Sequence, residues 1–314
     1  MLFSWRALKQ AGVIGLNARN SRYIMGYNDR RRYPLVDDKI RTKGILIDHR
    51  IAVPEMLDVI RTQYEAGHLH SRLTQWEQFV IKPASGSGGD GIVVIAGKRR
   101  DYWITAGGRL LTLEDLQFHV SGILNGLYSL AGQPDAALFE ALVHSDPVLQ
   151  PLAPAGVPDI RVIVFRGTPV MAMIRLPTRR SGGRANLHQG AIGAGIHLAT
   201  GETLRAVMDR RVIDHHPDSD ALIPGFRIPG WDRLLELSAR CQQAVGLGYL
   251  GVDIVLDARH GPLVLELNAR PGLAIQIANQ AGLGRRLEAI ERKPDLESAD
   301  LATRLAWVHE LADL

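Results

Sequence analysis

Three oxygen-bearing side chains near the end of the sequence have the types and spacing that suit a metal ion. Glu266 and Asn268 lie two positions apart in the apolar run LVLELNARPG, so on a strand both side chains point to the same face. Asp253 lies in the run GVDIV, and the turn predicted at residues 259–261 joins the two runs into one hairpin. Two carboxylates and an amide oxygen on one face suit magnesium bound together with phosphates.

The alternative for these three residues is a solvated sheet face on which polar side chains alternate outward. The neighbouring positions on both strands are apolar, so both faces of the hairpin are expected to be buried. A buried acid without a cation is costly, because its charge is removed from water without compensation. We therefore favour the metal site.

A glycine-rich segment earlier in the chain has the features of a phosphate-binding turn. Lys82 lies at the end of the apolar run QFVIKP, and ASGSGGDG over residues 84–91 separates it from a second apolar run. Glycines let backbone N–H groups approach phosphate oxygens, and serine hydroxyls add further donors. The segment differs from a P-loop, because the lysine precedes the glycines and a strand follows them. An ordinary hairpin turn is the alternative, and the predicted metal site favours phosphate binding.

Further cationic and polar residues are candidates for contacts with anions. Lys39 begins a predicted helix over residues 39–47, although a solvated helix face is the usual place for a lysine. Arg161 shares a strand face with Asp159, and arginine suits bidentate contact with a carboxylate or a phosphate. A structural ion pair is the alternative for this arginine. The loop segment RANLH adds three candidates, for the last of which loop packing is the alternative: Arg184, Asn186 and His188.

The sequence predicts two α/β lobes that hold these candidates. Residues 1–36 have too few apolar side chains for a core of their own and are interpreted as an arm. The small lobe is expected over residues 37–136, the large lobe over 137–289, and a C-terminal helix over 290–314.

Individual elements follow from the same patterns. A helix is expected to begin at Pro54 and Glu55 and to continue to about Glu65. Residues 178–195 are interpreted as a polar, glycine-rich loop. Strands are expected at 78–83, 92–97 and 137–143, and a long helix at about 231–245. Hairpins are expected over 159–178, with a turn at 166–167, and over 249–272, with a turn at 259–261.

Composition and charge disfavour several classes of protein. The chain has 314 residues, of which 46% are hydrophobic and 22% are charged, so global disorder is not expected. A single cysteine, Cys241, excludes a disulfide framework within the chain and a cysteine-based metal site. The net charge of +4 is spread out and only 6% of the residues are aromatic, which disfavours a nucleic-acid partner. No run resembles a signal peptide or a membrane span, so we expect a cytoplasmic protein.

Seven motifs, taken in order, resemble those of the ATP-grasp superfamily. The resemblance runs from about Asp38 to Leu283, and the motifs that carry it read DDKIRTK, FVIKPASGSGGDGIVV, LFEAL, PDIRVIVF, RANLHQGA, LGVDIVLD and GPLVLELNARPGL. As a set they are most similar to the RimK-type ribosomal-protein glutamate ligases and to proteins described as alpha-L-glutamate ligase-like. The resemblance implies an α/β (α+β) ATP-grasp fold in which two lobes clamp ATP, with a reduced N-terminal arm in place of a full leading domain.

The resemblance also implies a role for each matching residue, with ATP and Mg²⁺ as cofactors and Mn²⁺ as an alternative metal. The positions that match contacts with ATP phosphates are Lys39, Lys82, Ser85, Gly86, Ser87, Gly88 and Gly89. The hinge that meets adenine is matched by Glu140, Ala141 and Leu142, without the aromatic residue often found there. The metal ligands are matched by Asp253, Glu266 and Asn268. The positions near the transferred phosphate and the carboxylate substrate are matched by Arg161, Arg184, Asn186 and His188.

The implied reaction joins a carboxylate to an amine through an acyl phosphate. The implied partners are an amino-acid carboxylate, glutamate or a similar one, and an amine acceptor on a peptide, a protein or a small molecule. Two alternatives stay open, an ATP-binding pseudoenzyme that regulates a partner and an ATP-grasp kinase that phosphorylates without ligation. Homo-oligomerisation is left open as well.

The arm provides one further expectation. Residues 15–32 are rich in asparagine and arginine, and Tyr23 and Tyr27 are four positions apart, which suits one helical face. Because only 38 residues precede Lys39, we expect the arm to pack across the cleft and to form part of the substrate or acceptor site. A frayed basic terminus is the alternative.

Overall fold

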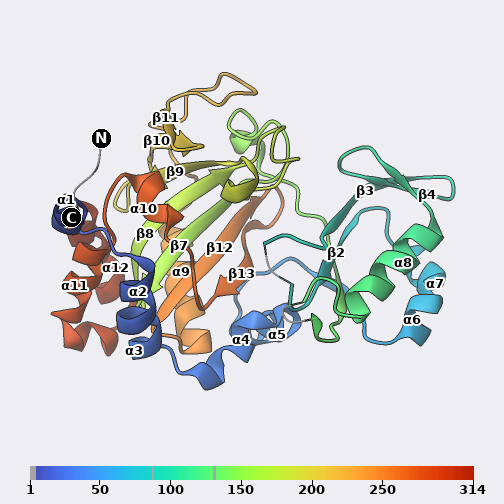
Figure 1. The fold of residues 1–314 in the computed structure, drawn as a ribbon, viewed down its shortest axis with the longest axis horizontal. Coiled ribbons are helices and arrows are strands. Elements are labelled where there is room, and N and C mark those ends of the chain that lie inside the picture. Colours follow the sequence, from blue (N-terminus) through green and yellow to red (C-terminus); the bar gives the residue numbers. More distant parts are fainter. Residues whose placement is uncertain (1–4, 87, 130–131) are drawn as a thin grey trace. The chain divides into compact units, whose positions relative to one another are not determined.

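Two antiparallel sheets organise the chain. The computed structural model describes residues 5–86, 88–129 and 132–314 (Figure 1). The backbone divides into a large unit, residues 1–37, 41–52 and 144–314, and a small unit, residues 38–40 and 53–143. Each unit has one of the sheets and its own helices, which agrees with the mixed helix-and-sheet class expected from the sequence.

The small unit is built on a six-stranded sheet with the order β1-β6-β2-β3-β4-β5. Its strands are β1 (Met56–Ile60), β2 (Phe79–Pro83), β3 (Val93–Arg99), β4 (Tyr102–Thr105), β5 (Leu110–Leu111) and β6 (Ala137–Glu140). Three helices contribute to its core, namely α6 (Gln63–Gly67), α7 (Leu69–Leu73) and α8 (Leu113–Leu124).

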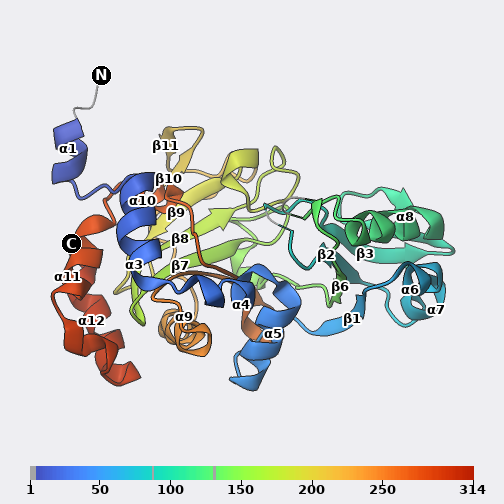
Figure 2. The same ribbon diagram turned by 60° about the horizontal axis from the view of Figure 1, so that its bottom comes forward.

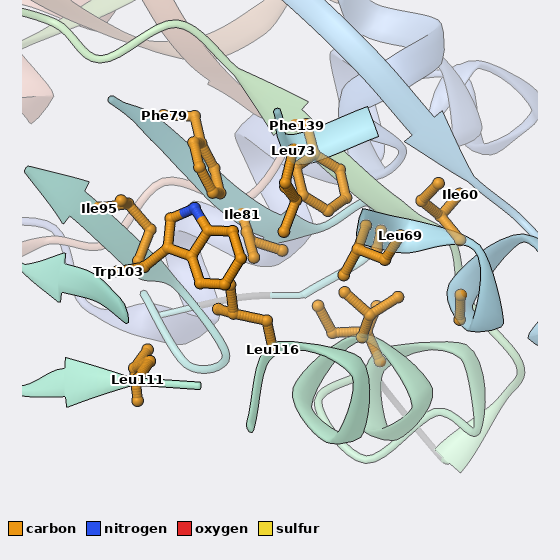
Figure 3. Close-up of a cluster of buried hydrophobic side chains, with 14 of the residues drawn as sticks. Ile60, Leu69, Leu73, Phe79, Ile81, Ile95, Trp103, Leu111, Leu116 and Phe139 are labelled. Carbon is orange, nitrogen blue, oxygen red and sulfur yellow. The ribbon is translucent and has the colours of Figure 1, made fainter. Parts of the chain in front are cut away.

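The core of the small unit lies between the sheet and these helices. Phe79, Ile81 and Ile95 from β2 and β3 are fully buried, and Trp103 of β4 lies beside them (Figure 3). Leu116 of α8 contributes from the helical side. Alternate strand positions therefore supply one apolar face, which fixes the strand register that carries Lys82.

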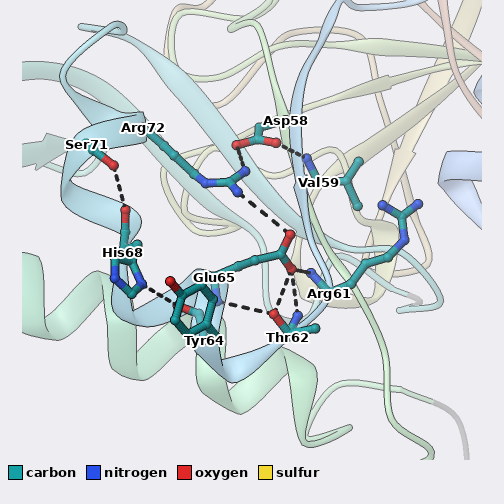
Figure 4. Close-up of polar contacts among 9 residues, drawn as sticks. All are labelled: Asp58, Val59, Arg61, Thr62, Tyr64, Glu65, His68, Ser71 and Arg72. Carbon is teal, nitrogen blue, oxygen red and sulfur yellow. Dashed lines mark hydrogen bonds and ion pairs between the residues drawn. The ribbon is translucent and has the colours of Figure 1, made fainter.

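Two threonine capping boxes define where helices of the small unit begin. The Thr62 hydroxyl accepts the N–H of Glu65 and the Glu65 carboxylate accepts the N–H of Thr62 (Figure 4). Thr112 and Asp115 repeat the arrangement at the start of α8. Arg72 joins the first box through its ion pair with Glu65, so side-chain contacts as well as packing hold the N-terminal end of α6.

The large unit is built on a seven-stranded sheet with the order β11-β10-β9-β8-β7-β12-β13. Its strands are β7 (Asp159–Phe165), β8 (Thr168–Leu176), β9 (Ile192–Ile196), β10 (Thr203–Met208), β11 (Arg211–Ile213), β12 (Tyr249–Asp257) and β13 (Gly261–Asn268). Every residue of β12 is buried, which is expected for a central strand covered on both faces.

Helices flank this second sheet. They are α9 (Trp231–Val245), α10 (Ala274–Asn279), α11 (Gly284–Glu291) and α12 (Leu301–Ala312). The helix α5 (Lys39–Asp48) begins in the small unit and continues in the large unit. The helix α9 packs against β7, β8 and β12, whereas α10 packs against β8, β9 and β10 (Figure 2). In the part of the chain that the structure describes, no helix has both the length and the apolar character needed to cross a membrane.

The described part of the arm, from residue 5 onward, packs within the large unit. Its short helical segments are α1 (Trp5–Gln10), α2 (Leu16–Ala18), a π-helical turn (Arg19–Ile24), α3 (Met25–Tyr27), a 3-10 turn (Arg30–Arg32) and α4 (Pro34–Asp37). The rings of Tyr23 and Tyr27 both meet Phe165 edge-on, at centroid distances of 5.7 and 4.8 Å. The two tyrosines thus anchor one face of the arm, as their spacing predicts.

Several sequence-based boundaries differ from the structure. The segment after Pro54 is the strand β1 rather than a helix, because Met56–Ile60 pairs with β6 along its length. The strand β6 was expected to open the large lobe, but it lies between β1 and β2 in the small unit. The expected loop over 178–195 ends in β9, and the expected helix over 290–314 is the end of α11, a 3-10 turn and α12.

The hairpins that carry the candidate residues are confirmed. The strands β7 and β8 turn at Arg166–Gly167, where both residues have positive φ, and β12 and β13 turn at residues 258–260. The glycine-rich segment joins β2 to β3, which pair antiparallel as expected.

Candidate active site

Three strands of the large unit place charged residues in one row. Asp253 on β12 lies opposite Arg161 on β7 and opposite Glu266 on β13. Directly opposed residues on neighbouring strands share a sheet face. Asn268 lies two positions beyond Glu266 and therefore on the same face. The structure thus brings the three predicted metal ligands to one side of the sheet, together with Arg161.

Two arginines hold the carboxylate of Asp253. The Nε and Nη2 atoms of Arg161 donate to its two oxygens at 2.7 and 2.6 Å, and Nη2 of Arg175 donates to Oδ2 at 2.8 Å. Arg175 also makes a bidentate pair with Asp159, its partner across the β7–β8 hairpin. The result is a buried network of two acids and two guanidinium groups with no net charge.

The network sets the ionisation of Asp253. Burial disfavours the charged carboxylate, but Arg161 and Arg175 outweigh this effect, so the pKa of Asp253 is lowered to about 2. Burial opposes the charge of Arg175 too, yet Asp159 and Asp253 raise its pKa above the ordinary value. Asp253 is therefore an anion whose charge is already matched, and the structural ion pair considered for Arg161 is present.

Glu266 and Asn268 have oxygens that are open to a cation. Both residues are partly buried, and within the described residues the Glu266 carboxylate has no hydrogen bond or ion pair. The Asn268 Oδ1 atom accepts the N–H of Arg270 at 2.8 Å, which leaves it a second lone pair. Asp253 already accepts three of the roughly four hydrogen bonds that a carboxylate can take. The chemistry of this set fits a hard cation such as Mg²⁺, with Glu266 and Asn268 as the more open donors.

In the small unit, both predicted phosphate lysines already have partners. The Lys82 ammonium pairs with Glu140 Oε2 at 2.5 Å, across the neighbouring strands β2 and β6, and both residues are largely buried. The Lys39 ammonium donates to the carbonyl of Gly86 at 2.5 Å, and the Lys39 N–H donates to the carbonyl of Ala84. Lys39 therefore lies against the first residues of the glycine-rich segment.

The glycine-rich segment is fixed at both of its ends. The Asp135 carboxylate accepts the N–H of Ser85 at 2.9 and 3.1 Å, and the carbonyl of Gly91 lies 3.0 Å from Nε2 of His119. Gly88 and Gly89 between these ends have φ values of +69° and +84°, a region that favours glycine. Ser87, also assigned to phosphate binding, lies outside the described residues.

The remaining predicted residues have mixed surroundings. The Glu140 carboxylate accepts a hydrogen bond from Lys82, and the Ala141 N–H donates to the carbonyl of Glu55. The contact of residues 140–142 with adenine stays a prediction. Arg184 and His188 are exposed, and the Asn186 side chain accepts the N–H of His188 to begin a 3-10 turn. The hydrogen bonds found for Arg184 and His188 among the described residues lie within their own loop, so their catalytic assignment also stays a prediction.

Arg175 is the charged residue of the network that the sequence analysis missed. It lies opposite Asp159 only because the β7–β8 register shifts by one residue between Ile163 and Val164. Without that bulge the turn at 166–167 would place Ile174 there. An arginine in an apolar strand was the available signal, since a buried cation requires a partner.

Comparison with known proteins identifies relatives. The chain matches probable alpha-L-glutamate ligases, with 27% identity over 161 residues for the protein of Maridesulfovibrio salexigens and 30% over 135 residues for that of Pseudomonas aeruginosa. These segments cover 51% and 43% of this chain but only 38% and 34% of the relatives. The chain therefore spans well under half the length of these ligases, and their likeness confirms the resemblance expected from the motifs.

Two solved structures that the chain resembles at low identity are an ATP-grasp ligase and a D-alanine–D-alanine ligase. The ATP-grasp ligase PsnB complexed with minimal precursor has a TM-score of 0.45 and 18% identity, over 85% of this chain and 64% of that one. The D-alanine–D-alanine ligase from Bacillus anthracis has a TM-score of 0.46 and 13% identity, over 96% and 76%.

One family match extends over most of the sequence. The family described as sugar-transfer associated ATP-grasp matches residues 18–292, which include the arm from Ala18 onward, both lysines and all three predicted metal ligands. The chain belongs to the sugar-transfer associated ATP-grasp family.

Proposed function

We propose that this chain is an ATP-dependent carboxylate–amine ligase that works through an acyl phosphate. The chain is a member of an ATP-grasp family. The observation that carries the proposal is that one sheet face holds both the open carboxylate of Glu266 and the arginine network around Asp253. A carboxylate that has no ion pair among the described residues, on the sheet face that also carries Arg161 and Arg175, suits the joint binding of a cation and of anionic groups.

The small unit would contribute the phosphate contacts of ATP. Lys39 would exchange the Gly86 carbonyl for a phosphate oxygen, with which its charged donor makes a stronger hydrogen bond. Lys82 would exchange the Glu140 carboxylate for another phosphate oxygen. The N–H groups at the glycine-rich turn would add neutral donors to the same anion. These assignments rest on the motif match and on the place of both lysines beside residues 84–86.

The large unit would contribute the metal site and the arginines. Glu266 and Asn268 would hold magnesium, with Asp253 next to them. A bound magnesium ion neutralises phosphate charge during phosphoryl transfer. Arg161 would contact the transferred phosphate or the carboxylate substrate, and Asp253 would orient it through two hydrogen bonds.

The chemistry takes two steps. An oxygen of the carboxylate substrate attacks the γ-phosphorus of ATP, the bond to the β-phosphate breaks, and ADP leaves. The amine nitrogen then attacks the acyl carbon, phosphate leaves with the original carboxylate oxygen, and the amine loses a proton. Catalysis is mainly positioning and charge neutralisation, because no covalent nucleophile of the protein is needed.

We propose glutamate or a similar amino acid as the carboxylate substrate, on the likeness to probable alpha-L-glutamate ligases. The family description, which names sugar transfer, favours an acceptor amine that carries or accompanies a sugar over a ribosomal protein. Peptide and protein amines remain in the test set.

A screen of ADP release tests this proposal. Amino acids would be supplied singly with ATP and magnesium, with and without amines that include amino sugars and peptides, and products would be identified by mass spectrometry. We expect ADP and a product lighter by one water than the sum of its two substrates. ADP and a phosphorylated acid without any amide product would instead support the kinase alternative, and nucleotide binding without ADP in every mixture would support the pseudoenzyme.

A further inference from the structure

The turn that follows Asn268 is held by the N-terminal arm at three consecutive residues. Ala269, Arg270 and Pro271 each contact a different residue of the arm or of α4. The residues that make these contacts are called the arm clasp below, and they are Arg19, Asn28, Tyr33 and Asp37. All of them belong to the large unit.

Asn28 is the buried member of the arm clasp. Its Nδ2 atom donates to the carbonyl of Ala269 at 3.1 Å and to the carbonyl of Tyr249 at 2.8 Å. Its Oδ1 atom accepts the N–H of Tyr249 at 2.8 Å. One side chain that is 4% exposed therefore joins the start of β12 to the end of β13, the two strands that carry the metal-ligand candidates.

Arg270 and Pro271 are held by three exposed or partly buried side chains, those of Asp37, Tyr33 and Arg19. Nη2 of Arg270 donates to both oxygens of Asp37 at 2.8 Å, and its guanidinium group lies 4.9 Å from the ring centre of Tyr33. Nη1 of Arg19 donates to the carbonyl of Pro271 at 2.9 Å.

The other side of the turn lies against β12. A Cβ atom added to Gly251 would lie 2.7 Å from Cβ of Pro271, so the proline ring rests on the strand that carries Asp253. The arm clasp on one side and β12 on the other leave the turn little freedom.

The position of the turn determines the orientation of the Asn268 amide. Asn268 Oδ1 accepts the N–H of Arg270, so a shift of Arg270 changes the direction of this oxygen and of its second lone pair. We infer that the arm clasp positions Asn268 for a divalent cation and is in this way part of the metal site without touching the metal. This inference rests on the proposed function and gives the arm a role different from contact with the substrate.

A merely structural arm is the competing explanation, and the arm supplies matched controls for it. Arg22 lies three residues after Arg19 and pairs with Glu288 and Glu291 of α11, away from the turn. Asp29 pairs with Arg31 within the arm. Arg22→Ala and Asp29→Ala therefore remove an arginine or an aspartate of the same segment without removing a contact to residues 269–271.

The experiment compares Arg19→Ala and Asp37→Ala with these two controls in the full chain. The first readout is amide hydrogen exchange of the peptide over residues 266–273 without nucleotide. The second is the gain in ADP affinity that magnesium produces, measured by calorimetry with magnesium and again with a chelator. The increase in ADP affinity caused by magnesium depends on the metal ligands, whereas the ADP affinity measured with the chelator does not.

We expect exchange at the turn to rise about fivefold in Arg19→Ala and Asp37→Ala, the effect of one lost hydrogen bond, and the magnesium gain to fall by a similar factor. Both controls should match the wild type in both readouts. Unchanged exchange in Arg19→Ala and Asp37→Ala would overturn the inference, and so would an equal fall of the magnesium gain in the controls. A wild-type chain without any magnesium gain would instead overturn the proposed function, and that result differs from failure of the arm clasp alone.

Discussion

Single residues in the large unit divide the site chemistry between them. Asp253 and Glu266 lie opposite each other on neighbouring strands, yet Asp253 is neutralised by two arginines and Glu266 has an open carboxylate. A nucleotide site can use both acids, because Asp253 orients the guanidinium groups of the protein and Glu266 is open to a metal ion from solution. The two acids should therefore respond differently to substitution.

Glu266→Gln tests the open carboxylate. The substitution removes one negative charge and little volume, and no ion pair is broken in the described residues. We expect ADP formation to fall by roughly 100-fold or more, since one electrostatic contact to the reacting groups is lost. The melting temperature should stay within a degree or two of the wild type, and Glu202→Gln, at an exposed position, is the matched control. Undiminished ADP formation would remove Glu266 from the site.

Lys39→Ala and Lys82→Ala test the phosphate contacts and should differ in one respect. Each is expected to weaken ATP binding by about 1–3 kcal/mol, the contribution of a charge-assisted hydrogen bond. Lys82→Ala also removes the ion pair between Lys82 and the buried Glu140, so we expect this variant to lose more stability than Lys39→Ala. Calorimetry and thermal unfolding measure the two effects separately. Unchanged ATP affinity in both variants would contradict the assignment.

At the level of elements, the sequence predicted hairpins well and bulges not at all. The β7–β8 and β12–β13 hairpins were predicted because their apolar runs are long and their turns contain Gly167 and Gly261. The side-chain network could not be predicted, because the one-residue shift after Ile163 decides whether Arg175 or Ile174 faces Asp159. Alternation along β13 predicted that Glu266 and Asn268 share a face. The placement of Glu266 opposite Asp253 depends on a second one-residue shift, between Asp253 and Ile254, without which Leu265 would lie there.

The strand β1 was missed for a different reason. Its residues Met56–Ile60 have no helix or strand period strong enough to decide, and the preceding Pro54 suited a helix start. Pairing with β6 selects the strand, and that pairing joins segments about 80 residues apart. Local sequence carries no information on such a partner, which is also why β6 was expected in the wrong lobe.

The arginine network links three strands and should make Asp253→Asn strongly destabilising. The change leaves Arg161 and Arg175 with one fewer buried counter-charge, for which we expect a loss of about 3–5 kcal/mol in the free energy of unfolding.

The contribution of Asp253 to stability should depend on pH with a defined sign. Because the folded-state pKa of Asp253 is about 2 against an ordinary 3.8, its contribution is present above pH 3.8 and is lost as the pH falls toward 2. Urea unfolding between pH 2 and 5 should show this loss in the wild type and a smaller slope in Asp253→Asn, and equal slopes would contradict it.

The end of the glycine-rich segment should tolerate substitution less well than its middle. A Cβ atom on Gly91 would lie 2.5 Å from the ring of Tyr128, and the φ of +73° adds backbone strain. At Gly88 the φ is similar, +69°, but among the described residues no heavy atom outside its chain neighbours lies within 4 Å of the added carbon. We expect about 1 kcal/mol of destabilisation for Gly88→Ala and clearly more for Gly91→Ala, measured by urea unfolding. Equal effects would contradict the packing of Tyr128 against the glycine.

At the level of the whole molecule, the candidate residues are distributed over two units and an arm. The small unit contains the lysines and the glycine-rich segment, and the large unit contains the arginine network and the metal-ligand candidates. The arm is packed on the large unit through Tyr23, Tyr27 and Asn28, so it belongs to the framework of that site. The family match from residue 18 onward includes about half of this arm.

Ligation through an acyl phosphate is tested most directly by following one oxygen atom. The amino-acid substrate is labelled with ¹⁸O in its carboxylate, the chain is supplied with ATP, magnesium and the amine, and the released phosphate is analysed by mass spectrometry. Because the carboxylate oxygen that attacks phosphorus leaves with the phosphate, we predict one ¹⁸O atom in each phosphate and one amide bond for each ADP. Unlabelled phosphate formed at the same rate would mean that water, not the carboxylate, attacks ATP, and would contradict the proposed ligase.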